Sequence, residues 1–262
     1  KYHHIDEINN IAYPDWRKSQ LMKMVIDCID NFNNHTRGKL PIVLTDTQSP
    51  FDTATLILET TEFFTGCYMN EEVIREFMQK ITNLVIEFSR VQMQAIGNDA
   101  LVQPGHIFPA MPWMKGIALS DDNVAVASPD VNENIAMPYN QQISDAFGGL
   151  AVHSCGTWSH TMPIYKNIKG LTMIDSAADI VCDPNPNRPA DIRDALRGSG
   201  VIAKVRMGND TDTIRKILKD LVAPDLQLIV QIDYHERDSE KNYKRTSDML
   251  EALYAEQGVA VG

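Results

Sequence analysis

A histidine and a cysteine stand two residues apart at the end of a short apolar run, in the stretch "GGLAVHSCGTWSH" (148–160). If this run is a β-strand, the side chains of His153 and Cys155 point to the same side and are neighbours. Nitrogen and sulfur are the ligands that zinc prefers, and an imidazolium beside a thiol can also lower the thiol's pKa. The same pattern fits a hydrogen-bonded strand-end histidine beside a small buried cysteine. The spacing therefore leaves a metal site, an activated thiolate and a structural pair as alternatives.

A catalytic zinc site needs a third protein ligand, which the neighbours of this pair do not supply. The stretch "QIDYHER" (231–237) follows the last apolar run, and Asp233 and His235 share one face if that segment is extended. These two side chains can complete a metal site, serve as acid and base, or simply be surface charges after a strand. The adjacent pair Asp121 and Asp122 points to opposite sides of an extended chain, so at most one of them faces a site.

Residues 104–116, "PGHIFPAMPWMKG", contain three prolines together with His106 and Trp113. Such a stiff, apolar loop can form the wall of a ligand pocket. A loop that is merely packed on the surface explains the composition equally well.

The elements that must position these residues alternate along the chain. Apolar runs that are short and mostly continuous are typical of strands buried on both faces. Helical patterns lie between them: one begins after Asn70 and ends at Gly97, and two more cover 211–222 and 240–256. The expected strands are 41–46, 99–104, 149–154, 171–175, 201–206 and 226–232.

Alternation of this kind predicts a parallel sheet, either open and doubly wound or closed as a (β/α)8 barrel. A nucleotide-binding glycine fingerprint, which would favour the open sheet, is missing after the first run. Polar side chains at the ends of nearly every run, Asp175 and Arg206 among them, favour the barrel, because strand ends converge there on one active-site mouth. We predict an α/β fold of the (β/α)8 TIM-barrel type in one domain, residues 1–262. Because six runs are visible and the chain opens on "KYHHIDEINN", we expect this barrel to be incomplete at its N-terminal end.

Composition narrows the function. With 24 Lys and Arg against 35 Asp and Glu, the net charge is −11, which argues against nucleic acid as a partner. Apolar runs are all too short for a membrane span, which predicts no membrane partner. The four cysteines match no disulfide framework, and a reducing cytoplasm is the simplest location.

Three segments together resemble the uroporphyrinogen decarboxylase superfamily, which includes cobalamin-dependent methyltransferases. They are "DTQSPFD", "ALSDDNVAVASPDVNENIAMPYNQQISDAFGGLAVHSCG" and "IKGLTMIDSAAD". The resemblance runs from about Pro41 to Leu253 and implies the barrel fold. It also implies that His153 and Cys155 are zinc ligands, and that Asp233 or His235 replaces the third cysteine ligand of the methyltransferases.

From this resemblance we expect a methyltransferase that passes a methyl group from a methyl-corrinoid to a zinc-activated thiol. Zinc is the expected cofactor, and the expected partners are a small-molecule thiol, a tetrapyrrole or corrinoid substrate, and a corrinoid protein. We predict Asp175 and Asp122 as catalytic residues. The predicted substrate-binding residues are His106, Trp113, Arg206 and Tyr234.

Two alternatives remain open. One is uroporphyrinogen decarboxylation, which needs no metal but whose substrate carries eight carboxylates and calls for several arginines. Among the predicted strand ends, only Arg206 and Lys204 offer such charge. The other alternative is a superfamily member that binds a ligand without catalysis, because one fold hosts many functions.

Overall fold

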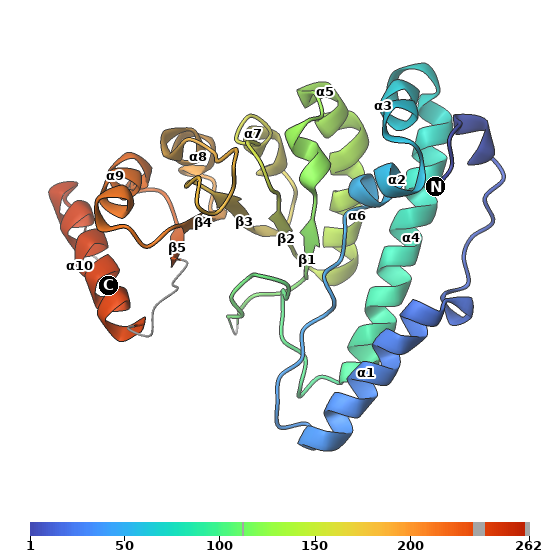
Figure 1. Ribbon diagram of the computed structural model, residues 1–262, viewed down its shortest axis with the longest axis horizontal. Helices are drawn as coiled ribbons and strands as arrows, with labels where there is room; N and C mark the ends of the chain where they lie inside the picture. Colours follow the sequence, from blue (N-terminus) through green and yellow to red (C-terminus); the bar gives the residue numbers. More distant parts are fainter. Residues whose placement is uncertain (112, 233–238, 260–262) are drawn as a thin grey trace.

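Five parallel strands lie side by side in the order in which they occur along the chain (Figure 1): β1 (Ile117–Ser120), β2 (Leu150–His153), β3 (Leu171–Ala177), β4 (Ile202–Met207) and β5 (Leu228–Ile232). The structure is a computed structural model and describes residues 1–262 except 112, 233–238 and 260–262. A doubly wound sheet would reverse its strand order at a switch point, whereas a sequential order sends every crossover the same way. The predicted α/β fold with barrel-type winding is therefore confirmed for these five strands.

Alternate residues of each strand pack into two different layers. On one face, Leu119, Val152 and Ile174 join the main hydrophobic core together with the helices that follow the strands. On the other face, small and apolar side chains from four strands pack against Phe108 and Met114 of the loop 104–116. That loop therefore covers the face that a closed barrel would turn inward. Its packing on the sheet agrees with the packed-loop alternative, and its position beside the strand ends is compatible with a pocket wall.

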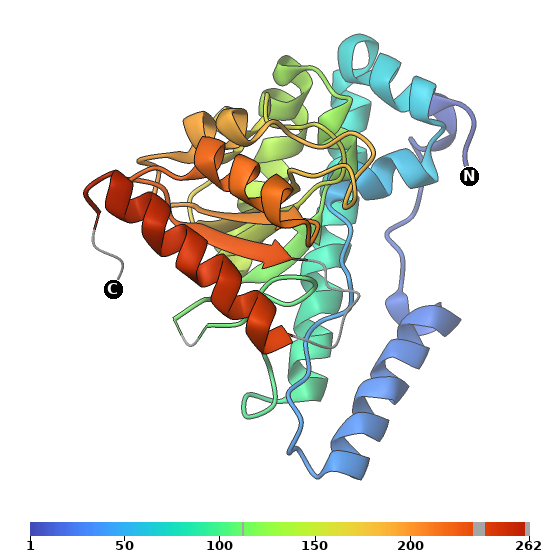
Figure 2. The same ribbon diagram turned by 60° about the vertical axis from the view of Figure 1, so that its left-hand side comes forward.

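The helices form a layer along one face of the sheet, with α10 beside β5 at its end (Figures 1 and 2). The α-helices are α1 (Gln20–Thr36), α2 (Pro50–Ile57), α3 (Thr60–Met69), α4 (Glu71–Ile96), α5 (Pro129–Val131), α6 (Met137–Phe147), α7 (Met162–Tyr165), α8 (Pro189–Leu196), α9 (Thr211–Leu221) and α10 (Ser239–Glu256). Short 3-10 turns are η1 (Ile5–Glu7), η2 (Trp16–Lys18) and η3 (Asp122–Ala125), and the π-helical turn η4 (Asn132–Ala136) joins α5 to α6. Within the described part of the chain, no helix combines the length and apolarity needed to cross a membrane.

The predicted elements hold where the pattern is long or continuous. The helix expected after Asn70 is α4 and ends before Gly97, and strands are present within 149–154, 171–175, 201–206 and 226–232. The strands expected at 41–46 and 99–104 are wrong, because these segments form a single parallel bridge, Ile42 to Leu101. Strand β1 was not among the expected strands. Its outer edge is bridged in parallel by Gln48, so the segment before α2 continues the sheet for one residue.

Gly116 and Gly149 are packed against each other where β1 and β2 begin. Gly116 has a φ of 94°, and a Cβ atom placed on it would overlap the backbone of Gly149. We expect Gly116→Ala to destabilise the protein by several kcal/mol, because neither backbone can yield cheaply. Gly148→Ala is the matched control: its φ is 72° but nothing lies within 4 Å, so it should cost only about 1–2 kcal/mol. Equal losses of unfolding free energy in urea would contradict this explanation.

Candidate metal centre

Four polar side chains lie in one row across neighbouring strands, at the ends of β1 and β2 and within β3 and β4. The register pairs Ser120 with His153, His153 with Asp175, and Asp175 with Lys204. All four lie at alternate positions to the core residues of their strands, so they belong to the face that the loop 104–116 covers. The sheet thus gathers polar groups on one face, close to the carboxyl ends of β1 and β2, where a barrel has its mouth.

Asp175 is fully buried at the centre of this row. Its Oδ2 atom accepts from His153 Nδ1 at 2.6 Å and from Arg206 Nε at 3.0 Å, and its Oδ1 atom accepts from Lys204 Nζ at 2.5 Å. Burial acts to raise the pKa of Asp175, but the hydrogen bond to His153 and the charges of Lys204 and Arg206 outweigh it and lower the pKa below its ordinary value. An ionised Asp175 can only accept, so Nδ1 of His153 carries the proton. The Nε2 atom is therefore left to face the site.

Continuing the register two residues beyond the strands brings Asp122 and Cys155 together. The backbone N–H of Cys155 donates to Asp122 Oδ1 at 2.7 Å, and Cys155 Sγ lies 3.4 Å from His153 Nε2. His153 Nε2 lies 3.9 Å from Asp122 Oδ1. One ligand atom from each of Asp122, His153 and Cys155 falls within 4.8 Å of the others.

The loop that carries Asp122 is held from below by another carboxylate. Asp52, on α2, accepts the backbone N–H groups of Asp122 and Asn123 at 2.7 and 2.8 Å, which satisfies the start of η3. The turn after Cys155 is held in a similar way, because the N–H of Gly156 donates to Asp183 at 2.7 Å. The two loops that present the potential ligands are therefore anchored by backbone hydrogen bonds.

The three donors fit zinc in type, and two of their three separations can be compared with zinc geometry. Tetrahedral zinc with bonds of about 2.0–2.3 Å needs neighbouring ligand atoms about 3.3–3.6 Å apart. The observed separations of 3.4 and 3.9 Å are close to that range. His153 also donates its other ring nitrogen to a carboxylate, the outer-shell arrangement that fixes the tautomer of metal-bound histidines. Cys155 is exposed and the Asp122 side chain is 45% exposed, which leaves the site open on one side.

In the absence of a metal, Cys155 is not an activated thiolate. Partial burial raises the pKa of its thiol to about 11, and the charge of Asp122 adds to the effect against a smaller opposing contribution from Arg206. This raised pKa does not favour a thiolate activated by an imidazolium alone. A cation bound between the three side chains would reverse this electrostatic balance.

Asp121 and Asp122 point in different directions, as predicted for adjacent carboxylates. Asp121 is buried and accepts hydrogen bonds from Ser49, Asn140 and Tyr165, each at 2.7 Å. Burial and the nearby Asp52 raise the pKa of Asp121 to about 7. Asp121 thus joins four segments beneath the site, and only Asp122 faces it.

His106 lies beside the candidate metal centre, as expected for a substrate-binding residue. Its ring centroid is 5.6 Å from that of His153, and its Nδ1 atom is 3.4 Å from Asp46 Oδ1, which also accepts from Ser120 at 2.9 Å. The backbone of His106 has a φ of 51°, an unusual value for a residue with a side chain. Loop 104–116 therefore holds this imidazole at the mouth despite a conformational cost.

The other predicted residues differ in their placement. Arg206 lies in the site through its bond to Asp175, and its Nη2 atom is buried without a hydrogen-bond partner among the described residues. Trp113 is 61% exposed in the covering loop and, within the described chain, makes no ring contact with His106 or His153. The predicted third ligands and Tyr234 fall within 233–238 and lie outside the described residues.

Asp122 is the third potential ligand, a role that the sequence did not predict for it. It was predicted as catalytic, whereas the structure places it with the metal donors. The available signal was the short apolar segment "GIALS" directly before it, which is β1. Recognising that strand would have placed Asp122 two residues beyond a strand end, in the same position as Cys155 after β2.

Known proteins resemble this chain both in part of its sequence and in its fold. Residues 1–103 match the family described as uroporphyrinogen decarboxylase (URO-D). A solved structure of a methyltransferase from Methanosarcina mazei shares the fold with a TM-score of 0.62 and 12% identity, over 94% of this chain and 69% of that chain. Comparison with curated proteins gave no match.

The family match over residues 1–103 and the shared fold agree with the predicted resemblance to the uroporphyrinogen decarboxylase superfamily. The segment matched by the family ends at residue 103. Asp122, His153 and Cys155 all lie after that segment, so their proposed role depends on their geometry.

Proposed function

We propose that this protein is a methyltransferase that passes a methyl group from a methyl-corrinoid to a zinc-activated thiol. The observation that carries the proposal is the convergence of Asp122, His153 and Cys155, with the ligand atoms of all three within 4.8 Å of one another. The methyltransferase that shares the fold supports the reaction class. The thiol, the corrinoid donor and a corrinoid protein as its carrier are parts of the proposal.

In this proposal Cys155, His153 and Asp122 hold the zinc ion. When bound, zinc would lower the pKa of the acceptor thiol, so that a thiolate is available at neutral pH. Asp175 accepts the proton on Nδ1 of His153 through the bond at 2.6 Å, which orients the ring so that Nε2 faces the site. Lys204 and Arg206 in turn keep Asp175 ionised, because both cations bind the same carboxylate.

His106 and Arg206 are proposed to hold the substrate. Burial lowers the pKa of His106, which favours the neutral ring at pH 7. One nitrogen of a neutral imidazole donates a hydrogen bond and the other accepts one. The unpartnered Nη2 atom of Arg206 is a donor that a polar group of a substrate can satisfy after a small movement. Trp113, exposed in the covering loop, is proposed to contact the substrate or the carrier protein.

Uroporphyrinogen decarboxylation is less well supported. Its substrate would need several cationic partners, and the two cations of the strand ends, Lys204 and Arg206, are already bound to Asp175. A non-catalytic role does not by itself account for three potential metal ligands gathered within 4.8 Å at an exposed mouth. We propose the cytoplasm as the protein's location, because the spacing of the four cysteines matches no disulfide framework.

A direct assay separates these functions. Zinc-loaded protein is mixed with methylcobalamin and a small thiol, and the loss of methylcobalamin absorbance and the formation of thioether are followed together. The proposal predicts zinc-dependent turnover that Cys28→Ser, which removes another exposed thiol, leaves intact. A parallel assay supplies uroporphyrinogen without added zinc. Consumption of uroporphyrinogen there, together with no thioether in the first assay, would support the decarboxylase instead.

A further inference from the structure

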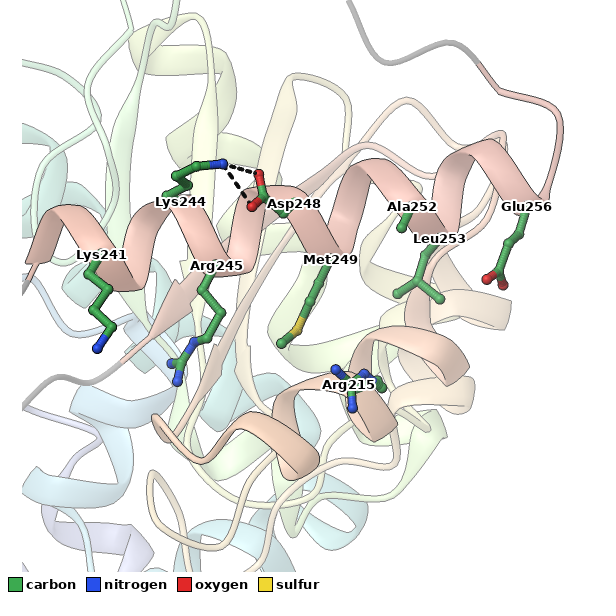
Figure 3. Close-up of a pocket in the computed structure, with 9 residues that line it drawn as sticks. All are labelled: Arg215, Lys241, Lys244, Arg245, Asp248, Met249, Ala252, Leu253 and Glu256. Atoms are coloured by element: carbon green, nitrogen blue, oxygen red, sulfur yellow. Dashed lines mark hydrogen bonds and ion pairs between the residues drawn. The ribbon is translucent and has the colours of Figure 1, made fainter.

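A groove with an unusual charge runs between α9 and α10, on elements that carry none of the candidate metal ligands. Its cavity of about 560 Å³ is lined mainly by one face of α10, with Arg215 contributed by α9 (Figure 3). We call it the cationic groove and define it by Arg215, Lys241, Lys244, Arg245, Asp248, Met249, Ala252, Leu253 and Glu256. Four of these residues are cations and two are acids, in a chain whose net charge is −11.

The cations of the groove are not equally neutralised. Lys244 Nζ donates to both carboxylate oxygens of Asp248, each at 2.9 Å. Arg245, by contrast, donates to Thr211 Oγ1 at 2.6 Å and to the Asn209 carbonyl at 3.0 Å, both of which are uncharged. Its Nε atom is buried and has no hydrogen-bond partner among the described residues. The charge of Arg245 helps to lower the pKa of the nearby Asp210 carboxylate, so this guanidinium is partly neutralised, while its buried Nε atom remains a donor that a ligand can satisfy.

Two further cations share the open side of the groove with Arg245. Figure 3 shows Lys241 and Arg245 extending from α10 toward the same side as Arg215, whereas Lys244 turns to the other side, toward Asp248. Arg215 is 61% exposed, and its contact with Asp212 at 3.5 Å joins two exposed groups, which makes it weak. Lys241 lies in the first turn of α10, where the helix dipole adds positive potential.

The other half of the groove is largely apolar and ends at Glu256. Met249, Ala252 and Leu253 continue along α10 from the cationic end, and Met249 and Leu253 are half-buried against the main core. A ligand that fits both halves has a strongly anionic group joined to an apolar body. A cavity of about 560 Å³ suits a small molecule, since such pockets measure roughly 300–1,000 Å³.

We propose that the cationic groove binds a small phosphorylated molecule, with its phosphate between Arg215, Lys241 and Arg245 and its apolar part against Met249 and Leu253. A phosphate monoester carries about −1.5 to −2 charges at pH 7, which matches a groove lined by several cations better than a single carboxylate does. Guanidinium groups also bind phosphate oxygens in pairs. This site is separate from the proposed methyl-transfer site and does not depend on its chemistry.

Titration calorimetry with phenyl phosphate as the probe tests the proposal. The expected result is binding with a Kd in the millimolar range or tighter, weakened by added salt, and weaker for benzoate or inorganic phosphate, each of which lacks one half of the ligand. Arg215→Ala combined with Lys241→Ala should weaken binding at least about tenfold, because two charge-assisted contacts are lost. Both side chains are exposed, so the fold should be retained, and circular dichroism checks this. The single variants provide the same test if the double variant is unstable.

The matched control is Lys219→Ala, which removes an exposed positive charge from α9 outside the groove. It should leave the Kd unchanged. The proposal is overturned if wild-type protein does not bind phenyl phosphate at millimolar concentration. It is also overturned if the groove variants bind as wild type does, or if Lys219→Ala weakens binding as much as they do, since the effect would then come from overall charge.

Discussion

Replacing Cys155 by serine is expected to remove bound zinc and thiol methylation together while leaving the fold intact. The thiolate is the strongest of the three potential zinc ligands, and serine cannot ionise to replace it. The loss of zinc affinity should therefore exceed the roughly 10- to 100-fold that changes of an outer-shell partner cost. Competition of the protein with a chromophoric zinc chelator measures this affinity.

Two comparisons make the result specific to the metal centre. Cys28→Ser removes an exposed thiol on α1 and should change neither zinc affinity nor activity. Asp175→Asn retains the size of the side chain that orients His153, and it should weaken zinc by about 10- to 100-fold as an outer-shell change. If Cys155→Ser binds zinc as tightly as wild type, Cys155 is not a ligand.

The largest effect on stability is expected for Asp175→Ala. This change leaves Lys204 and Arg206, which are 3% and 15% exposed, without their shared carboxylate. Removing one partner of a buried ion pair typically costs about 3–5 kcal/mol. Urea unfolding at pH 7 should show a loss of this order. Asp225→Ala, which breaks the exposed pair with Arg197, should cost no more than about 1 kcal/mol.

The same prediction carries a pH dependence with a definite sign. Because the pKa of Asp175 is lowered in the folded protein, its stabilising contribution is fully present above the ordinary carboxyl pKa of about 4. The contribution disappears as the pH falls through the lowered value. The difference in unfolding free energy between wild type and Asp175→Ala should therefore be constant near neutral pH and shrink in acid. A difference that grows on acidification would contradict the assignment.

The sequence was sufficient for elements whose signal is local. Strands β2, β3 and β4 are continuous apolar runs, and α4 has an apolar stripe that ends before Gly97. Strand β1 was not predicted because it has only four residues and follows a proline-rich loop. The segments 41–46 and 99–104 are apolar enough for strands, yet they form only one bridge. Apolar composition alone therefore does not determine which segments pair into a sheet.

The candidate site was predictable only in part, for a different reason. The spacing of His153 and Cys155 within one segment placed them together, because strand geometry fixes i and i+2. The pairing of Ser120 with His153, which sets Asp122 beside Cys155, is a property of strand register and is not written in either segment alone. Analogy with the methyltransferases instead pointed to Asp233 or His235 as the third ligand. Those residues lie outside the described structure, and that expectation stays a prediction.

Metal analysis of the purified wild-type protein tests the proposed zinc centre most directly. Metal-free protein is incubated with excess zinc, freed of unbound metal by gel filtration, and analysed by mass spectrometry for zinc per chain. With Asp122, His153 and Cys155 in place, the expected result is one zinc ion per chain, lost from Cys155→Ser at matched purity. Wild-type protein that remains free of metal after this treatment would contradict the zinc mechanism.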